Sequence, residues 1–195
     1  MFIGAAGLET SAFAGSAWRL AAGGVFTALL VTACVTDVRW RRVPNWLVLA
    51  LAVLGIGFST AIDPVLPGLG RGLIGLVVGF SIWILFFAVG GMGAGDVKLI
   101  AAAAAWLGPG GAWRASLVAA LLGGLLSVVA LLLQRRLREG TQRVAIAVST
   151  MSIAPLGAVA PGVERRRYLP YGIALSGGAL LVAWFPEILG VWRGP

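Results

Sequence analysis

Residues 72–90 read GLIGLVVGFSIWILFFAVG, an unbroken run without a charged side chain. A helix needs about 20 predominantly apolar residues to cross the hydrocarbon layer of a bilayer. Working outward from this run, further apolar segments lie at about 17–36, 46–62, 97–107, 115–133 and 171–189. The pattern predicts an all-α, polytopic integral membrane protein with about six transmembrane helices.

The composition of the whole chain agrees with a membrane protein. Hydrophobic residues make up 59% of the 195 residues, charged residues make up 11%, and the mean hydropathy is +0.97. A soluble domain carries about 25% charged residues, and the alternating segments of an outer-membrane barrel are missing. We therefore interpret residues 1–195 as a single membrane-embedded domain. The segment 1–17 contains no Lys or Arg, so we expect the first apolar segment to be retained rather than cleaved as a signal peptide.

The basic residues predict an orientation. If the N-terminus lies outside, the segments at about 37–45, 91–96 and 134–169 are cytoplasmic, and 11 of the 15 Lys and Arg residues lie in or beside them. This is the distribution that the positive-inside rule requires. It also explains the net charge of +8 without a nucleic-acid partner, because no basic groove with interleaved aromatic residues is visible.

Two further features bear on the topology. Tryptophans collect at membrane–water interfaces, so we expect an outer and an inner belt. The outer belt would contain Trp18, Trp106, Trp113 and Trp192, and the inner belt Trp40 and Trp46.

Residues 144–160 are moderately apolar but contain Ser, Thr, Pro and Gly, and we interpret them as an interfacial cytoplasmic segment. The alternative, a further span, would invert the last helix.

The chain contains no histidine and a single cysteine, Cys34. Nucleophile pairs of the Ser-His or Cys-His type and histidine-based metal sites are thereby excluded. A disulfide framework and a zinc-binding thiolate cluster are excluded as well. We expect no metal and no other cofactor.

Only three aspartates occur in the chain, and two of them are expected at the same membrane face. Asp37 ends the first apolar segment and Asp96 precedes the fourth, which places both at the cytoplasmic side. Carboxylates are costly near a bilayer core, so those that are kept in a membrane protein are candidates for function. Asp63 precedes a proline in an outer loop and is interpreted as a turn residue without a catalytic role.

Each of these aspartates also has a structural interpretation. Asp37 is either an interfacial acid neutralised by nearby arginines or a functional group, and a helix C-terminus disfavours its negative charge. Asp96 suits the N-cap of the helix that follows it, where its anionic form would be stabilised. Four glycines in residues 90–95 strip the backbone before Asp96 of side chains and leave room for an extended substrate. Lys98 does not share a helix face with Asp96, and its structural role would be to extend to the inner interface.

Two carboxyl groups in contact do not both ionise readily, so one keeps a proton while the other stays charged. The charged group takes a proton from a water molecule that attacks an amide carbonyl, and the protonated group donates to the carbonyl oxygen. Such a pair needs neither histidine nor a metal.

The motifs around both aspartates resemble those of the prepilin peptidase, or type IV leader peptidase, family. Gly93-Ala94-Gly95-Asp96 matches its Gly-x-Gly-Asp signature, and the similarity extends over residues 91–100 and 105–108. Asp37 followed by Val43-Pro44-Asn45 is similar to the family's first aspartate with its Ile-Pro-Asn/Asp element, with valine replacing isoleucine. Residues 170–175 read PYGIAL, which is similar to a Pro-Tyr-Gly block in the short, tight-adherence (Flp pilus) branch.

The resemblance implies a membrane aspartic endopeptidase of the bacterial inner membrane, with Asp37 and Asp96 as catalytic residues. It would cleave the leader peptide of a prepilin or pseudopilin at the cytoplasmic face, and its partners would be that substrate, the lipid bilayer and the pilus assembly machinery. The residues that it implies for substrate binding are Gly93, Gly95, Lys98, Pro44, Asn45, Pro170, Tyr171 and Gly172. The cytoplasmic domain with paired Cys-x-x-Cys motifs found in long members is absent from this sequence, so the resemblance leaves open whether N-methylation with S-adenosylmethionine also occurs.

Three other functions remain open at this point. One is a Gly-x-Gly-Asp intramembrane protease that cuts within transmembrane segments of a broader set of substrates. Another is a proton-coupled transporter that uses Asp37 and Asp96 as relay groups, and a third is an inactive assembly factor. The glycine-rich segment beside the membrane favours a peptidase, because a relay acid would lie deeper in the bundle.

Overall fold

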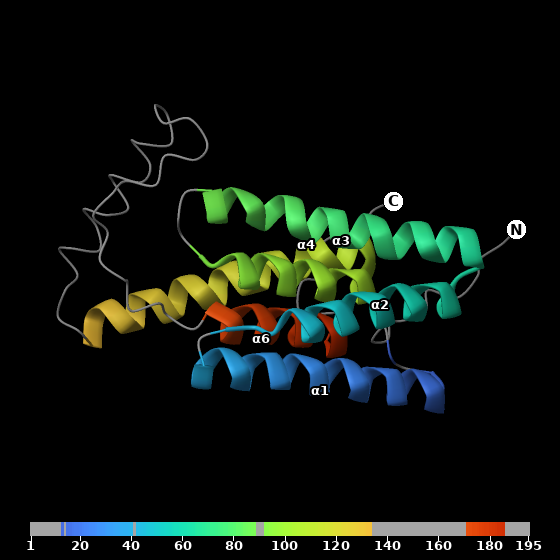
Figure 1. Ribbon diagram of the computed structural model, residues 1–195, viewed down its shortest axis with the longest axis horizontal. Coiled ribbons are helices and arrows are strands. Elements are labelled where there is room, and N and C mark those ends of the chain that lie inside the picture. Colours follow the sequence, from blue (N-terminus) through green and yellow to red (C-terminus); the bar gives the residue numbers. More distant parts are fainter. Residues whose placement is uncertain (1–12, 14, 41, 89–91, 134–170, 186–195) are drawn as a thin grey trace, which may run out of the picture.

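The computed structural model describes residues 13, 15–40, 42–88, 92–133 and 171–185, and its regular elements are all helices. The helices are α1 (Ala17–Trp40), α2 (Asn45–Ile62), α3 (Val65–Ala88), α4 (Ala94–Leu133) and α6 (Tyr171–Trp184), and they run roughly side by side (Figure 1). Four of these helices are long and apolar enough to cross a membrane, and α6 is a shorter apolar helix. The predicted all-α, polytopic membrane fold is confirmed. Residues 144–160, expected to be interfacial, lie outside the described residues.

Several helix bounds differ from the predicted spans. The third span was expected to begin at Gly72, but α3 begins at Val65, shortly after α2 ends at Ile62. The predicted spans 97–107 and 115–133 both belong to α4, which begins at Ala94. The first span was expected to end at Thr36, whereas α1 continues to Trp40. Helix propagation costs little once a helix has formed, so helices extend past the strictly apolar stretch. Pro67 does not prevent this in α3, because it lies in the first turn, where its missing N–H needs no acceptor.

The helix α4 is divided into two halves by a break at Gly108. This residue has φ 70° and ψ 179°, a conformation that is essentially restricted to glycine. Pro109 follows, and proline suits the first turn of the second half because its missing N–H needs no acceptor there. The chain therefore turns at Gly108 and runs back, so that the two halves of α4 lie beside each other as two helical segments (Figure 1).

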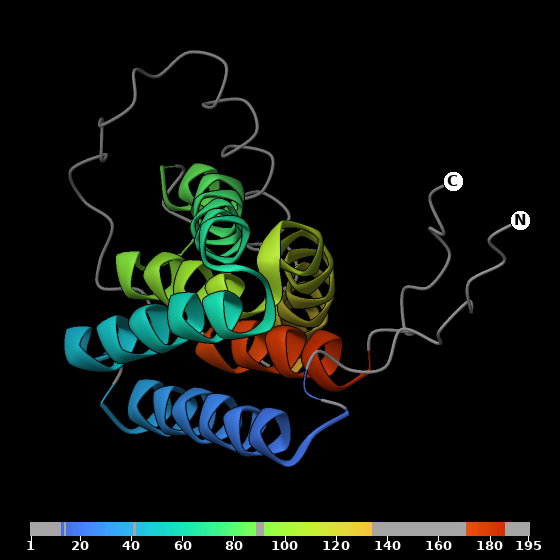
Figure 2. The ribbon, with the colours of Figure 1, turned by 90° about the vertical axis from the view of Figure 1, so that its right-hand side faces the viewer.

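The first half of α4 forms the centre of the bundle, with α3, α2 and α6 packed around it (Figure 2). Its residues from 99 to 107 are all buried, and the stretch 101–105 consists of alanines. Such small side chains allow close helix contacts in a membrane. On the side of α3, a Cβ placed on Gly75 would lie 2.5 Å from the carbonyl oxygen of Ala104, and one on Gly79 would lie 2.8 Å from the Ala104 Cβ.

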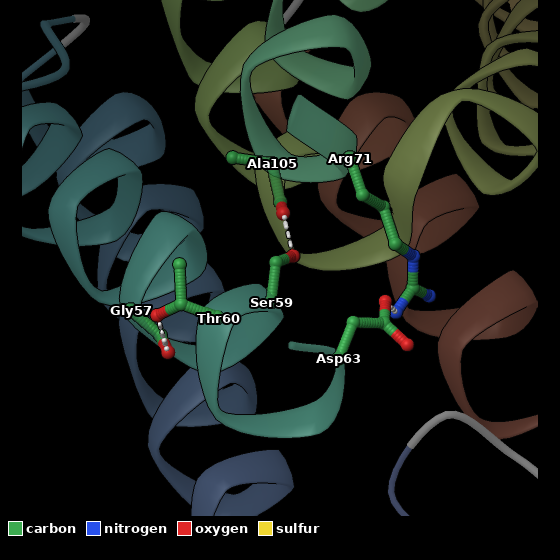
Figure 3. Close-up of polar contacts among 6 residues, drawn as sticks. All are labelled: Gly57, Ser59, Thr60, Asp63, Arg71 and Ala105. Carbon is green, nitrogen blue, oxygen red and sulfur yellow. Dashed lines mark hydrogen bonds and ion pairs between the residues drawn. The ribbon is translucent and has the colours of Figure 1, made fainter. Parts of the chain in front are cut away.

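Polar side chains cross-link α4 to its neighbours inside this apolar bundle. Ser59 of α2 donates to the carbonyl oxygen of Ala105 at 2.9 Å (Figure 3). Trp106 donates through Nε1 to the carbonyl oxygen of Leu51 at 2.8 Å, and its side chain is only 2% exposed. The prediction that Trp106 belongs to an outer aromatic belt is therefore wrong. Its polar N–H has a partner inside the protein, so the ring does not need the membrane interface to satisfy it.

At the end of the bundle away from Asp37 and Asp96, an ion pair links α2 and α3. Asp63, which follows α2, accepts from Nη1 of Arg71 at 3.2 Å, and both side chains are about one-third exposed (Figure 3). The Arg71 side chain also lies against Gly108, since a Cβ on that glycine would be 2.7 Å from its Nε. Asp63 thus has a structural contact at the turn between α2 and α3, as its position in the sequence suggests.

Candidate active site

Asp37 lies in the last turn of α1, and its carboxylate meets the beginning of α6. The backbone N–H of Gly172 donates to Oδ2 of Asp37 at 3.2 Å. Gly172 is the second residue of α6, where backbone N–H groups have no acceptor within their own helix. The C-terminus of α1 disfavours an anion, but the N-terminus of α6 stabilises one. The two helix ends therefore act on Asp37 in opposite directions.

Asp96 lies in the first turn of α4, and it forms hydrogen bonds with the backbone of Gly93, three residues earlier. Its Oδ2 accepts from the backbone N–H of Gly93 at 3.2 Å, while its own N–H donates to the carbonyl oxygen of Gly93 at 3.1 Å. Asp96 was expected to be the N-cap itself, and this expectation is wrong, because the helix already begins at Ala94. The acid occupies the third position and reaches back to the residue before the helix, as the acidic partner of a capping box does.

The fold brings the two carboxyl groups to the same end of the bundle. The C-terminal end of α1 and the N-terminal ends of α4 and α6 lie together at the left of Figure 1. Asp37 is close enough to Asp96 for its charge to act on that carboxyl group, and both side chains are half-buried. Two interacting acids that are partly shielded from water are suited to share one proton. In the described parts of the chain, no group of three or more His, Cys, Asp and Glu residues is placed to hold a metal ion.

The turn after α1 packs against the glycine-rich segment before α4. A Cβ built on Gly95 would lie 3.8 Å from the Cβ of Val43, so the Val43 side chain lies beside the Gly95 backbone at ordinary van der Waals distance. Pro44 is the residue before α2, with an extended backbone (φ −63°, ψ 136°), and Asn45 is the exposed first residue of that helix. The Val-Pro-Asn and Gly-x-Gly-Asp elements, which α2 and α3 separate in the sequence, are therefore in contact in the folded chain.

The remaining residues predicted to bind substrate do not share one environment. Lys98 is exposed in the second turn of α4. The hydroxyl group of Tyr171 lies 3.3 Å from Oγ of Ser127 in the second half of α4, so it links α6 to α4. Pro170 lies outside the described residues.

Sequence reasoning missed two of these contacts. Ser127 was not singled out, because a serine within an apolar helix has no local feature that identifies its partner. Gly172 was assigned to substrate binding, whereas its N–H is already bound to Asp37. Only the order of helix ends at one end of the bundle could have suggested this pairing, since the two positions lie near opposite ends of the chain.

Comparison with known proteins agrees with the motifs. The chain is 32% identical over 125 residues to the prepilin leader peptidase/N-methyltransferase of Xanthomonas campestris, covering 58% of this chain and 44% of the relative. It is 34% identical over 123 residues to the protein of that name in Escherichia coli, covering 57% and 52%. The Neisseria gonorrhoeae protein of that name is 32% identical over 122 residues, with 59% and 42% covered. The chain spans about half the length of the curated relatives it matches, and no solved structure matches it significantly.

The family assignment rests on the region that contains both aspartates. A sequence profile described as the type IV leader peptidase family matches residues 24–131, which is more than half of the chain. Asp37, Val43-Pro44-Asn45 and Gly93-Ala94-Gly95-Asp96 all fall inside this range, while Tyr171 and Gly172 fall outside it. The resemblance noted in the sequence is confirmed: the chain belongs to the type IV leader peptidase family.

Proposed function

We propose that this protein is a membrane aspartic endopeptidase that cleaves the leader peptide of prepilins or pseudopilins at the cytoplasmic membrane face. The observation that carries the proposal is the meeting of Asp37 and Asp96 at one end of the bundle, each held by a glycine N–H at the start of a helix. Membership in the family and the peptidase activity in the relatives' names support it. The proposal concerns the leader peptidase activity and not the N-methyltransferase activity that the relatives' names also print. Both aspartates proposed for peptide cleavage lie within the residues that match the family.

The arrangement supports acid–base catalysis by the pair. The ionised carboxylate removes a proton from a water molecule as its oxygen attacks the carbonyl carbon of the scissile amide. The protonated carboxyl group donates to the carbonyl oxygen, which gives a tetrahedral intermediate. Proton transfer to the leaving nitrogen then breaks the C–N bond and releases an amine and a carboxylic acid. Because each aspartate accepts a backbone N–H bond, its position does not depend on a flexible side-chain partner.

The surface formed by the Val43–Asn45 turn and the Gly93–Gly95 segment is the proposed place of the substrate backbone. In the Gly93–Gly95 segment side chains are small or absent, so an extended peptide can approach the carboxyl groups closely. Lys98, exposed on the same helix, is the proposed contact for a polar group of the substrate at the membrane surface.

The proposed location is the bacterial inner membrane, with the substrate delivered beside the pilus assembly machinery. The distribution of Lys and Arg supports a cytoplasmic position for the end of the bundle that carries both aspartates. A substrate with an apolar helix next to its cleavage site would lie in the lipid bilayer while its leader reaches this end.

Two alternatives predict different substrates for the same pair. An intramembrane protease of broader range would cut within the apolar segment of its substrate, and a proton-coupled transporter would move a solute without cutting any peptide. Both aspartates lie in terminal turns of helices and not in helix centres. This position favours cleavage beside the membrane over cleavage or proton relay at its centre.

The test uses single substitutions of each aspartate by its amide in cells that co-express a prepilin. Asp37→Asn and Asp96→Asn should each abolish leader cleavage, because an amide can neither accept the proton of water nor share a proton with its partner. Asp63→Asn is the matched control, since it changes an aspartate at the opposite end of the bundle. Immunoblots would follow the mobility of the prepilin and the membrane level of each variant. Normal processing by either of the first two variants would contradict the proposal.

A further inference from the structure

Gly172, at the start of α6, contacts Asp37 in two ways: through its backbone N–H and through the absence of a side chain. The Gly172 N–H donates to Asp37 Oδ2 at 3.2 Å, and Gly172 is buried. In addition, a Cβ placed on Gly172 would lie 2.6 Å from the same Oδ2 and 3.0 Å from Asp37 Cγ. The carboxyl group therefore occupies the space that any side chain at position 172 would need.

The remainder of the site does not hold Asp37 in this way. The helix α1 packs mainly against α6 and only lightly against α2 and α4. Asp96 is held by the backbone of its own helix start, whereas Asp37 is held by a different helix. The relative position of the two carboxyl groups therefore depends on where α6 begins.

We infer that Gly172 is a positioning residue for Asp37: its N–H and its missing side chain together set the place of one carboxyl group of the pair. This role replaces the substrate contact that the sequence suggested for Gly172. The inference rests on the proposed function only where it concerns catalysis, because the contact itself is a property of the fold.

A double-mutant cycle tests the contact without any measurement of activity. Gly172→Ala should lower the apparent melting temperature of the purified protein in detergent, although alanine is the better helix former. In the Asp37→Ala background the same change should cost less or raise the melting temperature, because the two shortest contacts of the new methyl group are gone. Equal losses in both backgrounds would overturn the inference. If Gly172→Ala folds only in the Asp37→Ala background, the contact is supported; if it folds in neither, the contact is contradicted.

The pH profile of prepilin cleavage tests the effect on catalysis. A displaced Asp37 loses an N–H donor and a helix N-terminus that favour its ionised form. The profile of kcat/KM against pH should therefore move to higher pH, with a maximum lower by about 100-fold. Among the described residues, the titratable groups that interact with the charge of Asp37 are Asp96 of α4 and Cys34 of α1, and both are unchanged in this variant.

Two other glycines of α6 provide matched controls. Gly177→Ala adds a methyl group 3.4 Å from the flexible end of Leu122 and should leave both the melting temperature and the profile unchanged. Gly178→Ala collides with the α4 backbone, 2.7 Å from the Ala119 nitrogen, so it should lower the melting temperature without moving the profile. An unmoved profile for Gly172→Ala would overturn the positioning role.

The outcomes separate the inference from the proposed function. If Asp37→Asn still cleaves prepilin, the proposed function fails, but the double-mutant cycle still decides whether Gly172 holds Asp37. If Asp37→Asn is inactive and Gly172→Ala cleaves with the wild-type profile, the proposed function stands and the inference fails.

Discussion

Asp37 and Asp96 occupy helix ends of opposite polarity, yet each accepts a backbone N–H from a glycine. For Asp96 this follows from local sequence, because Gly93 belongs to the same short motif. For Asp37 the donor belongs to α6, a helix near the other end of the chain. The Gly-x-Gly-Asp motif is therefore a self-contained unit, whereas the first aspartate depends on the assembled bundle for its electrostatic environment.

Trp106 allows a direct measurement of a buried hydrogen bond in this bundle. Trp106→Phe removes the Nε1 donor to the Leu51 carbonyl while it keeps most of the aromatic packing. We expect the free energy of unfolding in detergent to fall by about 1 kcal/mol. Trp113→Phe is the control, because Trp113 is 55% exposed and should show no measurable loss. A similar effect of both substitutions would mean that the Trp106 bond contributes no net stability.

At the scale of elements, the break in α4 determines how the centre of the bundle is filled. The alanine-rich first half ends at Gly108, and the second half returns beside α6. A straight helix of 40 residues would be about 60 Å long, far more than a bilayer core accommodates. The sequence predicted two spans here, at about 97–107 and 115–133. It did not predict that only one residue leaves the helical conformation.

The break is tested by comparing two glycines that lie close together in the sequence. Gly108→Ala places a side chain at φ 70°, ψ 179° and against Nε of Arg71, so it should cost about 1–3 kcal/mol of unfolding free energy. Gly110→Ala meets no atom within 4 Å and should be neutral or stabilising. Thermal unfolding in detergent would measure both variants. A neutral Gly108→Ala would contradict the unusual backbone conformation at this position.

At the scale of the whole molecule, the orientation in the membrane sets which compartment the aspartates face. Thiol labelling of intact cells tests it in a Cys34→Ser background, where single cysteines replace exposed residues at opposite ends of the bundle. Leu66→Cys, at a position that is 81% exposed, should react with a membrane-impermeant maleimide from outside. Asn45→Cys should react only after the membrane is permeabilised. The reverse pattern would place Asp37 and Asp96 on the outer side.

The membrane class, the family and the two candidate aspartates could all be predicted from the amino-acid sequence. These follow from local properties: the length of apolar runs, the cost of charge in lipid and short motifs read along one stretch of chain. Helix bounds were less predictable, as Val65 and Ala94 show, because a helix continues past its apolar stretch when nothing stops it.

Which side chains and helix ends contact each other depends on how the helices pack in the folded bundle. This packing placed the Tyr171 hydroxyl on Ser127, put Trp106 in the core and brought the Gly172 N–H to Asp37. None of these pairs has a periodicity or spacing that a sequence displays, because each joins helices whose rotation and depth are set by packing of small residues across the whole bundle. The free N–H groups at a helix start can donate to a carboxylate that is distant in the sequence as well as to a neighbouring one. The packing of the helices therefore determines which carboxylate accepts the hydrogen bond.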